Sequence, residues 1–224
     1  MRGKWLGWTF IHRATTRSCC YAYVRTKRSR VVHAKTHTSK QTVKSFRDKI
    51  SKPNIVLEVG SGSGSVITGV SRIFGANDCL YLAIDKNPKA AKCSKLMLKN
   101  EGVLKSDIIV TSLSSGMRLK GCVDVLLFNP PYVVTPDEEM EGDGISISWA
   151  GGKDGRIVID QFLKCVPDLL SPKGVLFLVL IEENKPQDVI QILKNKYGLS
   201  GSVVAKERCG IEILYILLVR RTPS

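Results

Sequence analysis

The stretch VDVLLFNPPYVV, residues 123–134, predicts a buried strand that ends abruptly. Its first six residues are almost all apolar, as in a parallel strand that is covered on both faces. An asparagine and two prolines follow, and proline cannot continue a central strand because it has no amide hydrogen to donate. We therefore expect a core strand over residues 123–128 whose carboxyl end presents a polar amide, a rigid turn and an aromatic ring.

Strand-like and helix-like segments alternate on both sides of this stretch, which predicts an α/β fold: a mostly parallel sheet with helices on both faces. The last two strands leave no room for a helix between them, so one of them is expected to be antiparallel. The expected strands are 55–59, 80–85, 107–111, 123–128, 174–180, 203–206 and 212–220. The expected helices are 66–74, 88–100, 156–170 with a break near Pro167, and 186–197, with one more candidate over 41–52.

Composition limits the class of protein. A chain of 224 residues with 43% hydrophobic and 24% charged residues can form one domain with a sizeable core. The seven cysteines are scattered and form no C-x-x-C pair, which favours reduced thiols over a disulfide framework or a metal site. No apolar run reaches the roughly 18 residues of a membrane-spanning helix.

The net charge of +14 is concentrated at one end of the chain. Residues 1–52 carry 14 Lys and Arg against one acid, a net charge of +13, whereas residues 53–224 carry 20 against 19, a net charge of +1. A mitochondrial transit peptide, a nucleic-acid-binding arm and a segment foreign to the native protein all remain open interpretations. We expect residues 1–52 to be poorly ordered and residues 53–224 to form the folded domain.

A glycine-rich stretch, EVGSGSG over residues 58–64, lies between an expected strand and an expected helix, where the backbone must turn sharply and can approach a ligand. The third glycine of a nicotinamide-binding motif would fall on Ser65, and the lysine of a P-loop is absent. Asp85 ends the next strand, where a carboxylate can accept hydrogen bonds from both hydroxyls of a ribose.

The turn after residue 128 suits the methylation of a planar nitrogen. The side-chain oxygen of Asn129 and the carbonyl of Pro130 can each accept one N–H of an amide or aromatic amine, and Tyr132 can stack on its flat group. Pro131 keeps the turn rigid. Such a site would act by orienting the nitrogen and by electrostatic stabilisation.

Together these motifs resemble the class I S-adenosylmethionine-dependent methyltransferases, and specifically the HemK-type glutamine methyltransferases. LEVGSGSG (residues 57–64), FNPPYVVTP (128–136), WAGGKDGR (149–156) and VPDLLSPKG (166–174) are most similar to the short eukaryotic branch. That branch modifies the Gly-Gly-Gln loop of the translation termination factor. The resemblance covers about residues 54–224.

The resemblance implies a Rossmann-like seven-stranded sheet, S-adenosylmethionine as cofactor and a small zinc-binding activator as heterodimer partner. It implies a cytoplasmic enzyme. Two alternatives stay open: a mitochondrial location, if residues 1–40 are a transit peptide, and a nuclear location. The candidate cofactor-binding residues are Glu58, Gly60, Gly62, Gly64, Asp85, Ser112 and Asn129. The candidate catalytic residues are Asn129, Pro130 and Tyr132, and the candidate substrate-binding residues are Asn129, Pro130, Pro131 and Tyr132. No metal ligand is expected.

The sequence departs from this branch at two places. The family's lid motif, similar to Y-E-P-A-E-D-T-F, has no counterpart in residues 1–53, and Ser112 stands where relatives often carry an acid that contacts adenine. Three functions therefore remain open: a protein-glutamine methyltransferase, a nucleic-acid adenine methyltransferase that uses the basic segment, and an isoform weakened by the missing lid.

Overall fold

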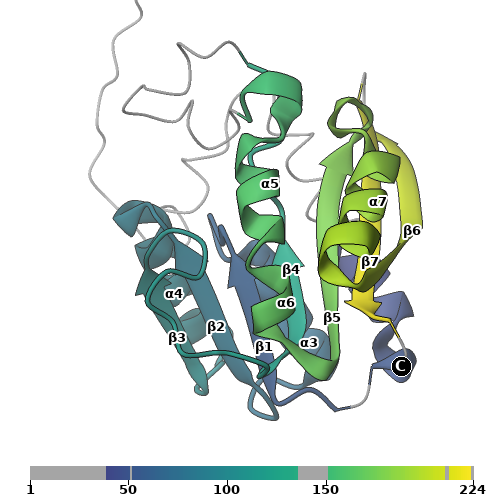
Figure 1. The fold of residues 1–224 in the computed structure, drawn as a ribbon. Helices are drawn as coiled ribbons and strands as arrows, with labels where there is room; N and C mark the ends of the chain where they lie inside the picture. Colours follow the sequence, from purple (N-terminus) through teal and green to yellow (C-terminus); the bar gives the residue numbers. More distant parts are fainter. Residues whose placement is uncertain (1–38, 51, 136–150, 210–211, 223–224) are drawn as a thin grey trace, which may run out of the picture.

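The computed structural model describes residues 39–50, 52–135, 151–209 and 212–222 (Figure 1). Its seven-stranded sheet has the order β3-β2-β1-β4-β5-β7-β6. Strands β1 to β5 pair in parallel, and β7 runs antiparallel to both β5 and β6, which confirms the predicted fold class. The bounds are β1 Ile55–Val59, β2 Leu80–Asp85, β3 Ser106–Val110, β4 Val123–Phe128, β5 Leu170–Ile181, β6 Leu199–Cys209 and β7 Glu212–Arg221.

Helices cover the sheet. In Figure 1, α5, α6 and α7 lie in front of the sheet and α3 lies behind it, while α4 packs beside α3 against β2 and β3. The bounds are α3 Ser65–Phe74, α4 Pro88–Asn100, α5 Ile157–Leu163, α6 Val166–Leu169 and α7 Pro186–Tyr197, with short 3-10 turns η2 Arg47–Lys49, η5 Lys153–Gly155 and η6 Glu182–Asn184. Within the described residues, no helix combines the length and the apolar character needed to cross a bilayer.

The expected break near Pro167 is confirmed, whereas two strands, β5 and β6, are markedly longer than predicted. The helix over 156–170 is divided into α5 and α6 as expected, and Pro167 lies in the first turn of α6, where its missing amide hydrogen costs nothing. Strand β5 begins at Leu170 because that residue pairs with Val123 across a register shift. Strand β6 is much longer than 203–206 because nearly its whole length pairs with β7, and its polar residues conceal this in the sequence.

The candidate helix expected over residues 41–52 is present in part and begins slightly earlier. Residues 39–45 form a helix that continues into η2, and Val43 is completely buried. The ring of Phe46 contacts that of Phe177 in β5, edge to face, with the centroids 6.2 Å apart. Residues 39–50 therefore pack on the core of the domain through their apolar face. The rest of the predicted disordered segment, residues 1–38, lies outside the described residues.

Candidate active site at the carboxyl edge of the sheet

Three neighbouring strands end at the same level. Val59 of β1 pairs with Ile84 of β2 on one side and with Phe128 of β4 on the other. The residues that follow these three, Gly60, Asp85 and Asn129, consequently lie in one row across the sheet. The strand order reverses between β1 and β4, which is where open α/β sheets bind their ligands.

The glycine loop after β1 has a backbone that only glycine adopts easily. Gly60, Gly62 and Gly64 have φ angles of +67°, +54° and +75°. A Cβ atom added at Gly62 would meet nothing within 4 Å, whereas one at Gly64 would lie 2.7 Å from the Cα atom of Ser94. The loop is therefore open at Gly62 and closed against α4 at Gly64.

Asp85 and Ser94 fix this loop. The Asp85 carboxylate accepts the backbone N–H of Gly62 at 2.9 Å and that of Asn87 at 2.8 Å, one with each oxygen. Each carboxylate oxygen has a further lone pair, so both can still accept a ribose hydroxyl. The buried Ser94 hydroxyl donates to the Gly62 carbonyl at 3.2 Å and lies 2.8 Å from the Ser61 hydroxyl. Sequence reasoning missed Ser94, because a serine within a helical pattern carries no signal of its own.

Glu58 is a buried acid directly before the loop. Its side chain is 3% exposed and accepts the Ile67 N–H at 2.9 Å. Burial raises the pKa of Glu58 to about 8, although the Ile67 N–H and the charge of Lys40 lower it in part. The neutral acid is thus favoured near neutral pH unless a cation is bound beside it.

Asn129 presents a side-chain oxygen that has no hydrogen-bond partner. This Oδ1 atom is buried, and no donor within the described residues reaches it. An unpaired buried acceptor costs about 1–3 kcal/mol, and native proteins seldom tolerate one without a reason. An N–H of a bound ligand would satisfy it.

The other predicted residues of this turn are more enclosed. Pro130 is buried and Pro131 is half-buried, while Tyr132 is 6% exposed and its ring belongs to the hydrophobic core. Burial raises the pKa of the Tyr132 hydroxyl, so this group stays protonated. The stacking role of Tyr132 stays a prediction. Ser112 is exposed, two residues beyond the end of β3, at the same edge of the sheet as Asp85.

A second segment packs against the turn. Gly151 donates to the Val133 carbonyl at 2.8 Å, and Gly152 donates to the Thr135 hydroxyl oxygen at 3.1 Å. The completely buried Asn184, at the end of η6, donates to the Tyr132 carbonyl at 2.9 Å. Asn184 was not predicted either, because it lies in a polar stretch, EENK, without periodicity.

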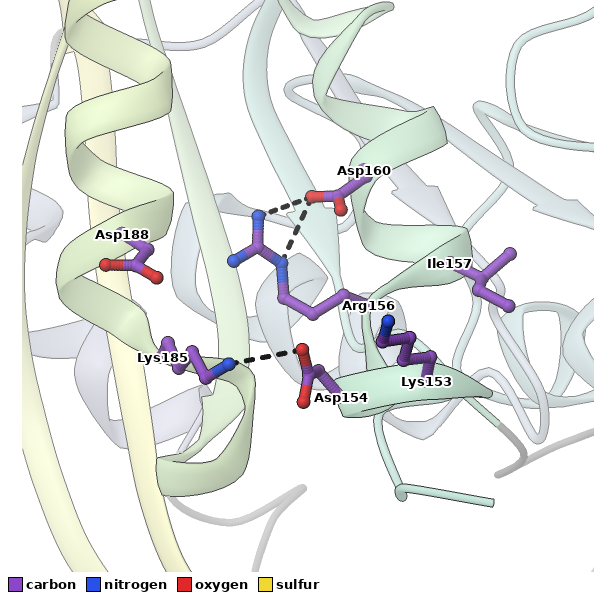
Figure 2. A pocket seen from close by; sticks show the side chains of 7 residues that line it. All are labelled: Lys153, Asp154, Arg156, Ile157, Asp160, Lys185 and Asp188. Atoms are coloured by element: carbon purple, nitrogen blue, oxygen red, sulfur yellow. Dashed lines mark hydrogen bonds and ion pairs between the residues drawn. The ribbon is translucent and has the colours of Figure 1, made fainter. Parts of the chain in front are cut away.

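A cavity of about 350 Å³ lies beside this junction (Figure 2). Arg156 and Asp160 form an ion pair at 2.6 Å in it, and Lys185 reaches across to Asp154 at 3.1 Å. None of the predicted site residues lines this cavity, so the candidate cofactor site is a separate place defined by the strand ends. The lining residues are Lys153, Asp154, Arg156, Ile157, Asp160, Lys185 and Asp188.

Known proteins resemble this chain along most of its length. It is 45% identical over 167 residues to methyltransferase HEMK2 of Homo sapiens, covering 73% of this chain and 76% of the human protein. It is 34% identical over 188 residues to the eRF1 methyltransferase catalytic subunit mtq2 of Schizosaccharomyces pombe, covering 80% and 81%. No family model matches the chain.

Among solved structures, the E. cuniculi Mtq2–Trm112 complex, responsible for the methylation of the eRF1 translation termination factor, has a chain of similar fold. The TM-score is 0.63 at 23% identity, and the match covers 84% of this chain and 94% of that one. At this identity the likeness concerns the fold alone.

Proposed function

The chain belongs to the family of release factor glutamine methyltransferases that includes HEMK2 and Mtq2, and from this membership we propose that it methylates the glutamine side-chain amide in the Gly-Gly-Gln loop of the termination factor eRF1. The unpartnered, buried Oδ1 atom of Asn129 is the observation that carries this proposal. It offers an acceptor to a substrate N–H at the row of strand ends where the cofactor of this family binds.

The cofactor of this family is S-adenosylmethionine, and the glycine loop and its neighbours fit it. Gly62 leaves open space in front of the loop, and the Asp85 carboxylate retains the lone pairs that ribose hydroxyls require. By analogy with the family, we assign Glu58, whose carboxylate accepts the Ile67 N–H, to the positively charged methionine end. When bound, the cofactor supplies an electrophilic methyl group on a sulfonium.

The residues of the turn orient the nucleophile. Asn129 Oδ1 accepts one N–H of the substrate amide, and we assign the second N–H to the main-chain carbonyl of Pro130. Both acceptors polarise the nitrogen and direct its lone pair, which matters because a planar amide is a weak nucleophile. The protonated Tyr132 cannot serve as the base, so the amide proton leaves to solvent after the methyl transfer.

An activator is part of this proposal. Strand β3 is an edge of the sheet, and Val110 on it is 54% exposed. An uncovered edge with apolar side chains is prone to aggregation. A zinc-binding partner of the Trm112 type, covering β3, would remove this liability, and the Mtq2–Trm112 complex is a precedent in a protein of the same fold. We propose a cytoplasmic location for this complex.

Mass spectrometry tests the proposal directly. The full chain, co-purified with a Trm112-type partner, is incubated with eRF1 and methyl-labelled S-adenosylmethionine. We expect one methyl group on the glutamine of the Gly-Gly-Gln loop and none on eRF1 in which this glutamine is replaced by glutamate. Label found only on lysine, or only on adenine of an added DNA oligonucleotide, would contradict the proposed substrate.

A further inference from the structure

Asn184 joins three segments that are far apart in the sequence. Its Oδ1 atom accepts the N–H of Ile181 at 2.9 Å, which ties it to the end of β5. Its Nδ2 atom donates to the carbonyl of Tyr132 at 2.9 Å and to that of Asp154 at 3.0 Å, with Gly155 O at 3.4 Å. Its side-chain amide therefore has all its hydrogen-bonding atoms engaged with backbone, inside a completely buried site.

The surrounding backbone leaves this arrangement little freedom. Gly155 has a φ angle of +65°, and a Cβ atom there would collide with the Tyr132 carbonyl oxygen. The turn at Gly151 and Gly152 pairs with residues 133–135. From outside, Arg156 reaches the Asn184 carbonyl at 3.4 Å. The amide of Asn184 thus lies at the centre of a packed junction between the turn after β4 and the turn after β5.

This junction sets the position of the catalytic turn. The Tyr132 carbonyl lies three residues beyond Asn129, and the intervening prolines transmit its position because their φ angles are fixed. A misplacement of about 1 Å in a catalytic group can cost on the order of 10²-fold in rate. The Asn184 amide, which holds the buried Tyr132 carbonyl, is well suited to prevent such a misplacement, since hydrogen bonds are strong where water is excluded.

We propose that Asn184 is a positioning residue for methyl transfer, which fixes the main chain at Tyr132 and thereby aims the Asn129 oxygen at the substrate nitrogen. The inference rests on the proposed function. Asn184 does not touch substrate, and its removal should change the turnover number without changing the affinity for cofactor.

Asn184→Asp is the informative variant. It keeps the shape of the side chain but replaces the donating amide nitrogen with an oxygen that faces three carbonyl oxygens. Val189→Ala is the matched control, because Val189 is completely buried in α7, its truncation should lower stability, and its apolar side chain makes no hydrogen bond in the junction. Lys185→Ala is a second control that removes only the exposed ion pair to Asp154.

Two measurements test whether Asn184 is a positioning residue. With eRF1 as substrate, we expect kcat of Asn184→Asp to fall by roughly 10²-fold while KM and the cofactor Kd stay unchanged, and both controls to stay near wild type. In hydrogen exchange without substrate, we expect the amides of residues 132–135 and 151–156 to exchange faster in Asn184→Asp than in the wild-type chain, and those of β1 to exchange at the same rate. Equal kcat in Asn184→Asp and Val189→Ala, or faster exchange over the whole sheet, would overturn the inference. An inactive wild-type chain would instead contradict the proposed function, and the exchange data would still decide the role of Asn184.

Discussion

At the scale of single residues, we expect Glu58 to couple cofactor binding to pH. Its pKa is raised from an ordinary 4.5 to about 8 by burial, so the stabilising contribution of the neutral acid is complete below pH 4.5 and is lost as the pH rises through about 8. A cation bound beside Glu58 reverses this preference, because it favours the carboxylate. Binding of S-adenosylmethionine near neutral pH should therefore release a proton from Glu58.

Titration calorimetry in two buffers of different ionisation enthalpy measures this proton. At pH 7 we expect the wild-type chain to release more protons on binding than Glu58→Gln, and its cofactor affinity to rise more steeply between pH 6.5 and 9. The glutamine variant can still accept the Ile67 N–H, and it corrects for the ionisation of the cofactor's own amine. Identical proton release from the two proteins would show that Glu58 is already ionised.

At the scale of elements, the helix over residues 39–45 lies in a segment whose charge pattern favoured disorder. Its apolar positions were visible, but they lie within a strongly basic segment, and the burial of Val43 depends on distant partners. We expect Val43→Ala to lower the free energy of unfolding by roughly 1–3 kcal/mol, from lost burial and the cavity left behind. Lys44→Ala, at the exposed neighbouring position, should change it by less than about 0.5 kcal/mol. Denaturant unfolding compares the two, and equal stabilities would mean that the helix is not packed on the core.

Elements defined by local pattern were predictable, and those defined by pairing were not. The runs over β1, β2 and β4 and the helix α7 carry their own periodicity and end signals, and the predicted bounds match the observed ones. Strand β6 is amphipathic at an edge, so only β7 determines its length.

The residues of the candidate site divide in the same way, into those that local sequence predicts and those that depend on remote contacts. The motifs mark Asp85 and Asn129, whereas Ser94 and Asn184 act through contacts to backbone that is remote in sequence.

At the scale of the whole molecule, the two edges of the sheet differ in what they leave exposed. Val110 on β3 is more exposed than Val203 on β6, the opposite edge. If the activator covers β3, Val110→Asp should abolish its binding and Val203→Asp should not, since a charge on the covered strand would be buried without a partner. Size-exclusion chromatography of each variant with a purified Trm112-type protein gives the result. Loss of the complex in Val203→Asp alone would place the partner on the other edge.

We propose that Asn129 orients a glutamine amide for methyl transfer, and the single-turnover rate of Asn129→Ala measures this role. With saturating eRF1 and S-adenosylmethionine, we expect this rate to fall by about 10²-fold or more, by analogy with the loss of one preorganised hydrogen-bond partner. Cofactor affinity and the unfolding midpoint, measured on the same sample, should stay close to the wild-type values. An alanine variant that methylates the Gly-Gly-Gln loop at the wild-type rate would contradict this role of Asn129.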